Sequence, residues 1–314
     1  MLRTLSANSI DEERRVRRER FRSRYLSLHF ASGLAWKIVR FVLLFGLCYI
    51  ILYPFLIKII NAFKGVADFS DPTVRFIPKN FTVENVLRVF GVMDYWQSLL
   101  NTFIISLVCA VLQTGISALV GYGFARFKFR LNKLLFGAVI FSLVVPVEVI
   151  IIPLFLRFRH FLGFINLIDT PLPIFILSLT GFGIRNALYI FLLRQFFRNM
   201  PKELEEAAYL DGCGVFRTYW RVMLPSAGSM LITVFLLSFA WQWTDTVYSS
   251  LFLREFHVLA NMVSMAESLG AGEAMIASNY IGIAACLAVL PLTAIYIVTQ
   301  RFFVQSVATS GLVG

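Results

Sequence analysis

Six long apolar segments follow one another along the chain, separated by polar stretches. A helix that crosses the hydrocarbon core of a bilayer needs about 20 mostly apolar residues. The segments that meet this requirement are 38–60, 101–124, 134–156, 172–196, 228–250 and 281–299. The pattern therefore predicts an all-α, polytopic membrane protein with six transmembrane helices.

The composition of the chain agrees with this prediction. Of the 314 residues, 58% are hydrophobic and only 15% are charged, whereas about 25% are charged in a typical soluble domain. These values exclude a disordered chain, a secreted disulfide scaffold and an ordinary cytosolic enzyme. The four cysteines form no C-x-x-C pair, so they are interpreted as small packing residues without a disulfide or a metal.

The basic residues predict the orientation, because cytoplasmic loops carry an excess of Lys and Arg. Six spans place both termini on one side of the membrane. With both termini inside, segments 1–37, 125–133, 194–227 and 300–314 carry 19 Lys and Arg residues, and the outer segments 58–100, 157–171 and 251–280 carry 8. The expected topology is therefore N-in, C-in. The net charge of +11 is then a mark of the cytoplasmic face and not of nucleic-acid binding.

Two parts of the chain are expected, a basic cytoplasmic segment 1–37 and a transmembrane domain 38–314. The stretch 11–24 holds four acids and seven arginines. It is either a short helix on the lipid headgroups or a solvated tail. It is not interpreted as a signal peptide, since the apolar run that follows starts too late and is too long.

Glu148 and Arg185 are charged residues within the predicted spans. A charge at the centre of a transmembrane helix costs about 3 kcal/mol of insertion free energy, so Glu148 is expected to face protein or water. It is a candidate for the solute pathway, and a satisfied buried carboxylate is the alternative. Arg185 follows two glycines and either lines the pathway or reaches the outer interface at a helix break. Pro146 and Pro153 are expected to bend the third span.

Several motifs of nucleotide-binding and hydrolytic proteins are missing from the chain. It contains no G-x-x-x-x-G-K-[ST], no H-E-x-x-H and no G-x-S-x-G. Glu148 and Asp245 are the only acids at plausible depth in the membrane, and they lie on different predicted helices. The chain is therefore expected to be non-catalytic. If transport is driven by ATP hydrolysis, another chain has to bind and hydrolyse the ATP.

The loop of about 197–227 has the pattern of two short helices beside the membrane. Asn199 and Pro201 fit a helix start, and the glutamates that follow favour the helix dipole. Gly212 and Gly214 end this helix, and an amphipathic helix 215–224 follows. The first helix is too short to be stable alone. It is either a docking element for the groove of another protein or a simple connection between spans.

An ordered series of residues in this loop resembles the EAA motif of binding-protein-dependent ABC importer permeases: Glu206-Ala207-Ala208, Asp211-Gly212 and Leu224-Pro225. Other positions resemble the carbohydrate-uptake permeases of the maltose-transporter type, namely 81–85, 101–102, 121–130, 146, 152–153, 194–197, 241–243 and 300–303. The resemblance covers roughly residues 38–314. The chain departs from the usual pattern at Thr244-Asp245, at Cys213 and in the last four residues, which lack a lysine.

The resemblance implies a type I ABC importer permease fold in the cytoplasmic (inner) membrane of a bacterium or archaeon. It implies that the EAA residues named above couple the chain to the ATPase. The implied partners are a homologous second permease, two copies of an ABC ATPase, an extracytoplasmic solute-binding protein and the lipid bilayer. No cofactor is expected in this chain, because the ATPase binds ATP and Mg. The implied cargo is a carbohydrate or sugar-like solute.

The candidate solute contacts besides Glu148 are Trp241, Trp243, Asp245 and Tyr248. The aromatic rings of Trp241, Trp243 and Tyr248 are suited to stacking on sugars, and packing within the membrane is the alternative. The alternative function is a secondary transporter or channel without an ATPase. It would not need a docking helix with a glycine break, and its inverted repeats are not visible in the sequence.

The outer stretch 251–279 is expected to contact the binding protein, with Ser268 and Gly270 as candidate positions. Its glycines and polar residues suit a flexible finger. A plain connector with an interfacial helix at 258–269 is the alternative.

Overall fold

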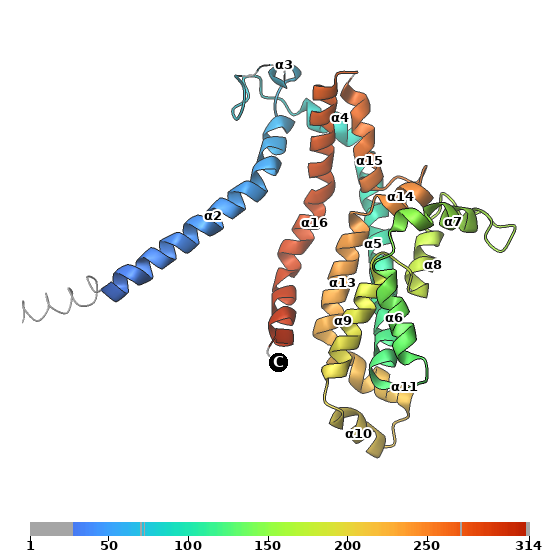
Figure 1. Ribbon diagram of the computed structural model, residues 1–314. Coiled ribbons are helices and arrows are strands. Elements are labelled where there is room, and N and C mark those ends of the chain that lie inside the picture. The colour runs from blue at the N-terminus through green and yellow to red at the C-terminus, as the bar shows by residue number, and fades with distance from the viewer. Residues whose placement is uncertain (1–27, 70, 72, 271, 312–314) are drawn as a thin grey trace, which may run out of the picture. The chain divides into compact units, whose positions relative to one another are not determined.

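The computed structural model describes residues 28–69, 71, 73–270 and 272–311 and is shown in Figure 1. Within these ranges the secondary structure is helical, with two isolated bridges, Lys64 to Phe81 and Phe161 to Ile165. This confirms the prediction of an all-α protein. The stretch 11–24 lies outside the described residues. The chain divides into two compact units, Met1–Ile59 and Ile60–Gly314, and each is considered by itself.

The described part of the first unit is a single long helix. Helix α2 spans Leu28–Ala62, and its last three residues belong to the second unit. Apolar side chains on all sides of the helix are exposed, among them Phe41, Leu44 and Ile51. A helix that is apolar all round is suited to lipid or to a partner helix.

Three continuous helical stretches are long and apolar enough to cross a membrane. They are Ala35–Ala62 within α2, the whole of α5 (Tyr95–Arg126), and Ala274–Arg301 within α16, which itself spans Ala274–Gly311. They contain the first, second and sixth predicted segments.

Two further spans are possible if bent helix pairs are counted, which gives up to five. Helix α6 (Asn132–Ser142) meets α7 (Val147–Arg159) at 98°. The break ends at Pro146, whose extended backbone cannot continue α6. The expected bend at Pro146 is present, whereas Pro153 lies inside α7. The second pair, Val215–Ser226 and α13 (Gly228–Trp243), is bent by 76°.

The fourth predicted segment, 172–196, is not one continuous helix. It contains α8 (Leu172–Thr180) and most of α9 (Asn186–Asn199). Gly181 and Arg185 have positive φ angles of 85° and 55°, which an α-helix cannot accommodate. Neither helix alone has the length of a span, so the structure does not reproduce the count of six.

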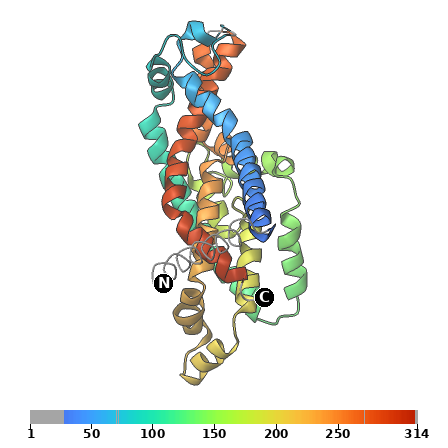
Figure 2. The same cartoon turned by 90° about the vertical axis from the view of Figure 1, so that its left-hand side faces the viewer.

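Shorter elements complete the second unit: α3 (Val66–Phe69), α4 (Glu84–Val92), α10 (Glu203–Leu210), α11 (Val215–Thr218), the π-helix η1 (Tyr219–Met223), α12 (Leu224–Ser226), α14 (Val247–Phe252), α15 (Leu259–Met265) and the 3-10 helix η2 (Ala266–Gly270). Figures 1 and 2 show α10 and α11 at one end of this unit and α3, α4 and the start of α16 at the other.

Helix α5 forms the centre of the second unit and packs against α8, α9 and α13. Buried polar side chains join these helices. Gln113 of α5 donates to Ser178 of α8 at 3.1 Å and accepts from Ser238 of α13 at 2.7 Å. Gly183 lies so close that a Cβ there would be 2.5 Å from Gln113 Nε2. The break between α8 and α9 thus allows the chain to approach α5 closely.

Candidate functional site

The local sequence explains the short helix α10. Three glutamates lie in its first turn, where they favour the positive end of the helix dipole. Gly212 has a φ of 76° and ends the helix, and Cys213 N–H donates to Ala208 O at 2.9 Å. Asn199 is not the N-cap that the sequence suggested, because it is the last residue of α9 and Lys202 takes the N-cap position.

The EAA residues do not all lie on one surface. Glu206 and Ala207 are exposed, whereas Ala208 is only 5% exposed and packs inward. Asp211 and Gly212 are exposed at the turn that follows. The outward surface of α10, α11 and η1 also carries large apolar side chains, Leu210, Val215, Phe216 and Trp220. We call these four residues the α10–η1 apolar patch.

Glu205 connects α10 to the C-terminal end of α5. Tyr122 Oη donates to Glu205 Oε1 at 2.7 Å, and Arg126 Nε lies 3.4 Å from Glu205 Oε2. Arg126 also donates from a terminal nitrogen to Met200 O at 2.8 Å. The side chains of Arg126 and Glu205 are almost fully buried. The loop is therefore held to α5 by an ion pair and two hydrogen bonds.

The sequence did not reveal this link. From the sequence, Glu205 is one of the glutamates that favour the helix dipole, Tyr122 is part of a resemblance, and Arg126 is also a basic residue of the predicted cytoplasmic loop 125–133. The spacing of four residues between Tyr122 and Arg126, which puts them on one face of a helix, was the available signal.

Leu224 and Pro225 lie in α12, at the bend before α13. Leu224 packs against a buried cluster that includes Tyr122, Phe197 and Tyr219. Pro225 is exposed in the first turn of α12. These residues connect the loop directly to α13.

The candidate solute contacts occupy several different environments. Glu148 is exposed in the first turn of α7. Trp243 is buried, and its indole N–H donates to Ala288 O of α16 at 3.0 Å. Trp241 is 40% exposed, and the guanidinium of Arg185 lies 4.0 Å from its ring centroid. The break at Arg185 thus forms a cation–π contact with α13.

Asp245 and Tyr248 lie around the start of α14. Asp245 accepts hydrogen bonds from the N–H groups of Val247, Tyr248 and Ser249 and from the Ser249 hydroxyl, at 2.8–3.2 Å. The carboxylate of Asp245 therefore caps α14. Tyr248 is half-buried and stacks on Phe252.

The stretch 251–279 contains α15 and η2, close to the helix 258–269 that the sequence offered as the alternative to a flexible finger. Gly270 is buried, and a Cβ there would lie 2.5 Å from the Cβ of Ala277 in α16. Ser268 is exposed. Of the two candidate positions, only Ser268 is open to a partner.

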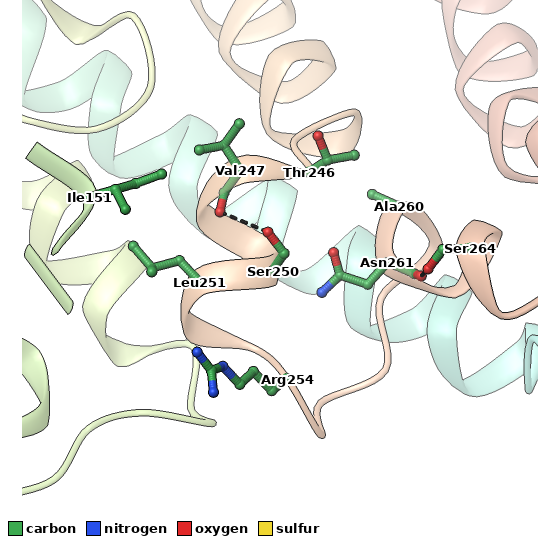
Figure 3. Close-up of a pocket in the computed structure, with 9 residues that line it drawn as sticks. All are labelled: Ile151, Thr246, Val247, Ser250, Leu251, Arg254, Ala260, Asn261 and Ser264. Carbon is green, nitrogen blue, oxygen red and sulfur yellow. Dashed lines mark hydrogen bonds between the residues drawn. The ribbon is translucent and has the colours of Figure 1, made fainter. Parts of the chain in front are cut away.

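A pocket of about 460 Å³ lies between α7, α14 and α15. Figure 3 shows its nine lining residues: Ile151, Thr246, Val247, Ser250, Leu251, Arg254, Ala260, Asn261 and Ser264. None of these was a candidate solute contact on sequence grounds, although five of them lie within the stretch 251–279 that was expected to contact the binding protein. They come from three helices and a loop, so no local pattern could have gathered them.

Comparison with known proteins identifies the class to which this fold belongs. Residues 113–309 match the family of the binding-protein-dependent transport system inner membrane component. The chain belongs to this family.

Two relatives and one solved structure support the assignment. The sn-glycerol-3-phosphate transport system permease protein UgpE of Rhizobium meliloti is 28% identical over 264 residues, which cover 82% of this chain and 90% of that protein. The arabinooligosaccharides transport system permease protein AraQ of Halalkalibacterium halodurans is 25% identical, over 85% of this chain and 93% of that protein.

The solved structure is a bacterial ABC transporter involved in the import of the acidic polysaccharide alginate. One of its chains matches with a TM-score of 0.69 and 23% identity, over 87% of this chain and 98% of that chain. This match shows a shared fold. The resemblance to ABC importer permeases that the EAA series suggested is confirmed.

Proposed function

We propose that this chain is a transmembrane permease subunit of an ATP-driven importer for a carbohydrate or sugar-like solute. The observation that carries the proposal is the loop around α10, which exposes Glu206, Ala207 and the α10–η1 apolar patch and is held to α5 by Glu205. A short helical segment that exposes apolar and acidic side chains is suited to the groove of another protein.

The mechanism follows from the connections of this loop. Tyr122 and Arg126 join α10 to α5, and α12 continues into α13. A displacement of α10 by a docked ATPase is therefore transmitted to two central helices. If ATP-bound ATPase binds one arrangement of these helices better than the other, it shifts the population between inward and outward access.

The assembly that we propose contains a homologous second permease, two ATPase copies that bind ATP and Mg, and an extracytoplasmic solute-binding protein. The chain would lie in the cytoplasmic membrane of a bacterium or archaeon, with both termini inside. In this arrangement the bent pair α6–α7, the pair α8–α9 and the pair α12–α13 each complete one of six crossings.

The proposed solute class rests on the relatives. Their names refer to sn-glycerol-3-phosphate, arabinooligosaccharides and alginate, which are sugars or sugar-like polyols. We therefore propose a hydroxyl-rich solute of this kind.

The coupling proposal is tested with Leu210→Arg, because Leu210 is 90% exposed on the apolar patch. We expect the variant to insert normally, to lose the co-purifying ATPase and to lose ATP-dependent uptake in proteoliposomes. The matched control is Leu131→Arg, the same change at another exposed leucine on the predicted cytoplasmic side. Uptake that persists without ATP, or full activity of Leu210→Arg, would contradict the proposal and favour a secondary transporter or channel.

A further inference from the structure

The pocket between α7, α14 and α15 combines a polar wall with an apolar one. Its polar side chains are Thr246, Ser250, Arg254, Asn261 and Ser264, and its apolar ones are Ile151, Val247, Leu251 and Ala260. The volume of about 460 Å³ lies in the range of small-molecule sites. Figure 3 shows the Asn261 amide pointing toward Ser250, with Arg254 at the lower edge of the group.

The polar wall offers hydrogen-bond acceptors on Ser250, Asn261 and Ser264. Ser250 Oγ donates to Val247 O at 3.1 Å, and Ser264 Oγ donates to Asn261 O at 2.8 Å. The Asn261 amide nitrogen donates to Leu253 O at 3.1 Å. Because both serine hydroxyl protons and one of the two Asn261 amide N–H groups are already engaged, the serine lone pairs and the Asn261 carbonyl oxygen remain to accept hydrogen bonds. A solute rich in hydroxyl donors matches such a wall.

Arg254 is the single charged residue among the nine that line the pocket. Within the described part of the chain its guanidinium has no salt bridge and donates no hydrogen bond, and its central carbon lies 5.2 Å from the centroid of the Phe155 ring. The backbone N–H of Arg254 donates to Asp169 Oδ1 at 2.8 Å. The backbone is thus held independently of the side chain, and the guanidinium keeps its donors for an anion.

We propose that this pocket binds an anionic sugar or polyol. The carboxylate or phosphate of the solute pairs with Arg254, its hydroxyls donate to Ser250 and Asn261, and its C–H face lies against Leu251. Arg254 is then a specificity-determining residue that separates charged from neutral solutes. The inference rests on the proposed transport function and names the solute class of that function.

The test uses the full chain, purified with any co-purifying subunits and reconstituted in nanodiscs. Ser264→Cys places a thiol at the exposed rim of the pocket, and its reaction with a membrane-impermeant maleimide is timed. The chain without this substitution sets the background from its four native cysteines. The probes are trigalacturonate, sn-glycerol 3-phosphate and neutral maltotriose, each over the same concentration series.

We expect trigalacturonate or sn-glycerol 3-phosphate to slow labelling, and maltotriose to have no effect at the same concentrations. Which anionic probe protects distinguishes a carboxylate solute from a phosphate one. In an Arg254→Gln background the half-protecting concentration should rise at least about tenfold, because a charge-assisted hydrogen bond is lost. The matched control is Arg157→Gln, which removes an exposed charge from the last turn of α7 outside the pocket.

Three results would overturn the assignment. The first is equal protection by maltotriose, and the second is protection that survives Arg254→Gln. The third is labelling that co-purified subunits block without any probe, because the pocket would then be a subunit interface. None of these affects the proposed importer function, because coupling through α10 is measured separately with Leu210→Arg. If Leu210→Arg fails to abolish ATP-dependent uptake while the anionic probes still protect the pocket, only the coupling proposal is wrong. If coupling is lost as expected and the probes do not protect, only the pocket proposal is wrong.

Discussion

Asp245 determines the geometry of the break that divides the predicted fifth span. It is buried, and its two oxygens accept four hydrogen bonds from the first turn of α14. A cap of this kind satisfies backbone N–H groups that have no partner within the helix. The single side chain thus positions α14, and with it Ser250 and Leu251 of the pocket wall.

Replacing Asp245 by Ala is expected to destabilise the protein by about 1–2 kcal/mol, the usual value of a helix N-cap. Asp245→Asn should be milder, because one oxygen still accepts. The measurement is the thermal unfolding midpoint of purified protein in detergent. An unchanged midpoint for the Ala variant would show that the cap contributes nothing to stability.

Glu148 differs from Asp245 because it is exposed, and its side chain has no hydrogen bond or salt bridge within the described residues. Glu148→Leu is expected to insert at least as well as the original chain, since removing a mid-span charge lowers the insertion cost by about 3 kcal/mol. Uptake per folded molecule should change if Glu148 lines the pathway. Unchanged normalised uptake would show that Glu148 does not line the pathway.

At the scale of elements, the short helix α10 depends on its neighbours. With eight residues it cannot be stable alone. Its buried residues are Ala208 and Glu205, and the Glu205 carboxylate contacts Tyr122 and Arg126 of α5. A buried carboxylate that loses its partners is costly, so the orientation of α10 is coupled to the end of α5.

Removing the charge of Glu205 is therefore expected to loosen α10 without preventing membrane insertion. Glu205→Ala should raise the rate of proteolysis within residues 199–214, and ATP-dependent uptake should fall. Tyr122→Phe, which removes one hydrogen bond, should have a smaller effect of the same kind, about 1 kcal/mol. The control is Glu203→Ala on the exposed first turn of α10. Equal protease sensitivity of Glu205→Ala and Glu203→Ala would refute the link.

At the scale of the whole molecule, the candidate ATPase contact at α10 and the candidate binding-protein contact at η2 lie far apart within the second unit. Figures 1 and 2 show α10 at one end of the second unit, while α15 and the start of α16 lie toward the other. This separation fits an ATPase on one side of a membrane and a binding protein on the other. Glu267 and Ser268 are exposed positions on η2, whereas Gly270 is buried against α16.

Cysteine at Ser268 is therefore expected to crosslink to the solute-binding protein, with a higher yield when the ATPase is trapped closed. Gly270→Cys should fail to give folded protein in normal amounts, because its side chain would collide with Ala277. Glu267→Cys is a second exposed probe. Labelling of the Ser268→Cys thiol from the cytoplasmic side alone would reverse the proposed topology.

The sequence alone determined the helical class, the apolar segments and the family. Segment hydropathy and the EAA series are local properties that need no knowledge of packing. Pro146 and the two glycines before Arg185 also indicated where helices would bend. The reason is that proline and glycine act on their own backbone.

Only the tertiary structure decided which residues meet. Glu205 is 83 positions from Tyr122, and the pocket joins Ile151 to residues about 100 positions later. Ala208 and Gly270 were expected at contact surfaces and are buried. Burial and pairing across such separations depend on how α5, α13 and α16 pack. The periodicity of one helix shows which of its faces is apolar but not which other helix packs against that face.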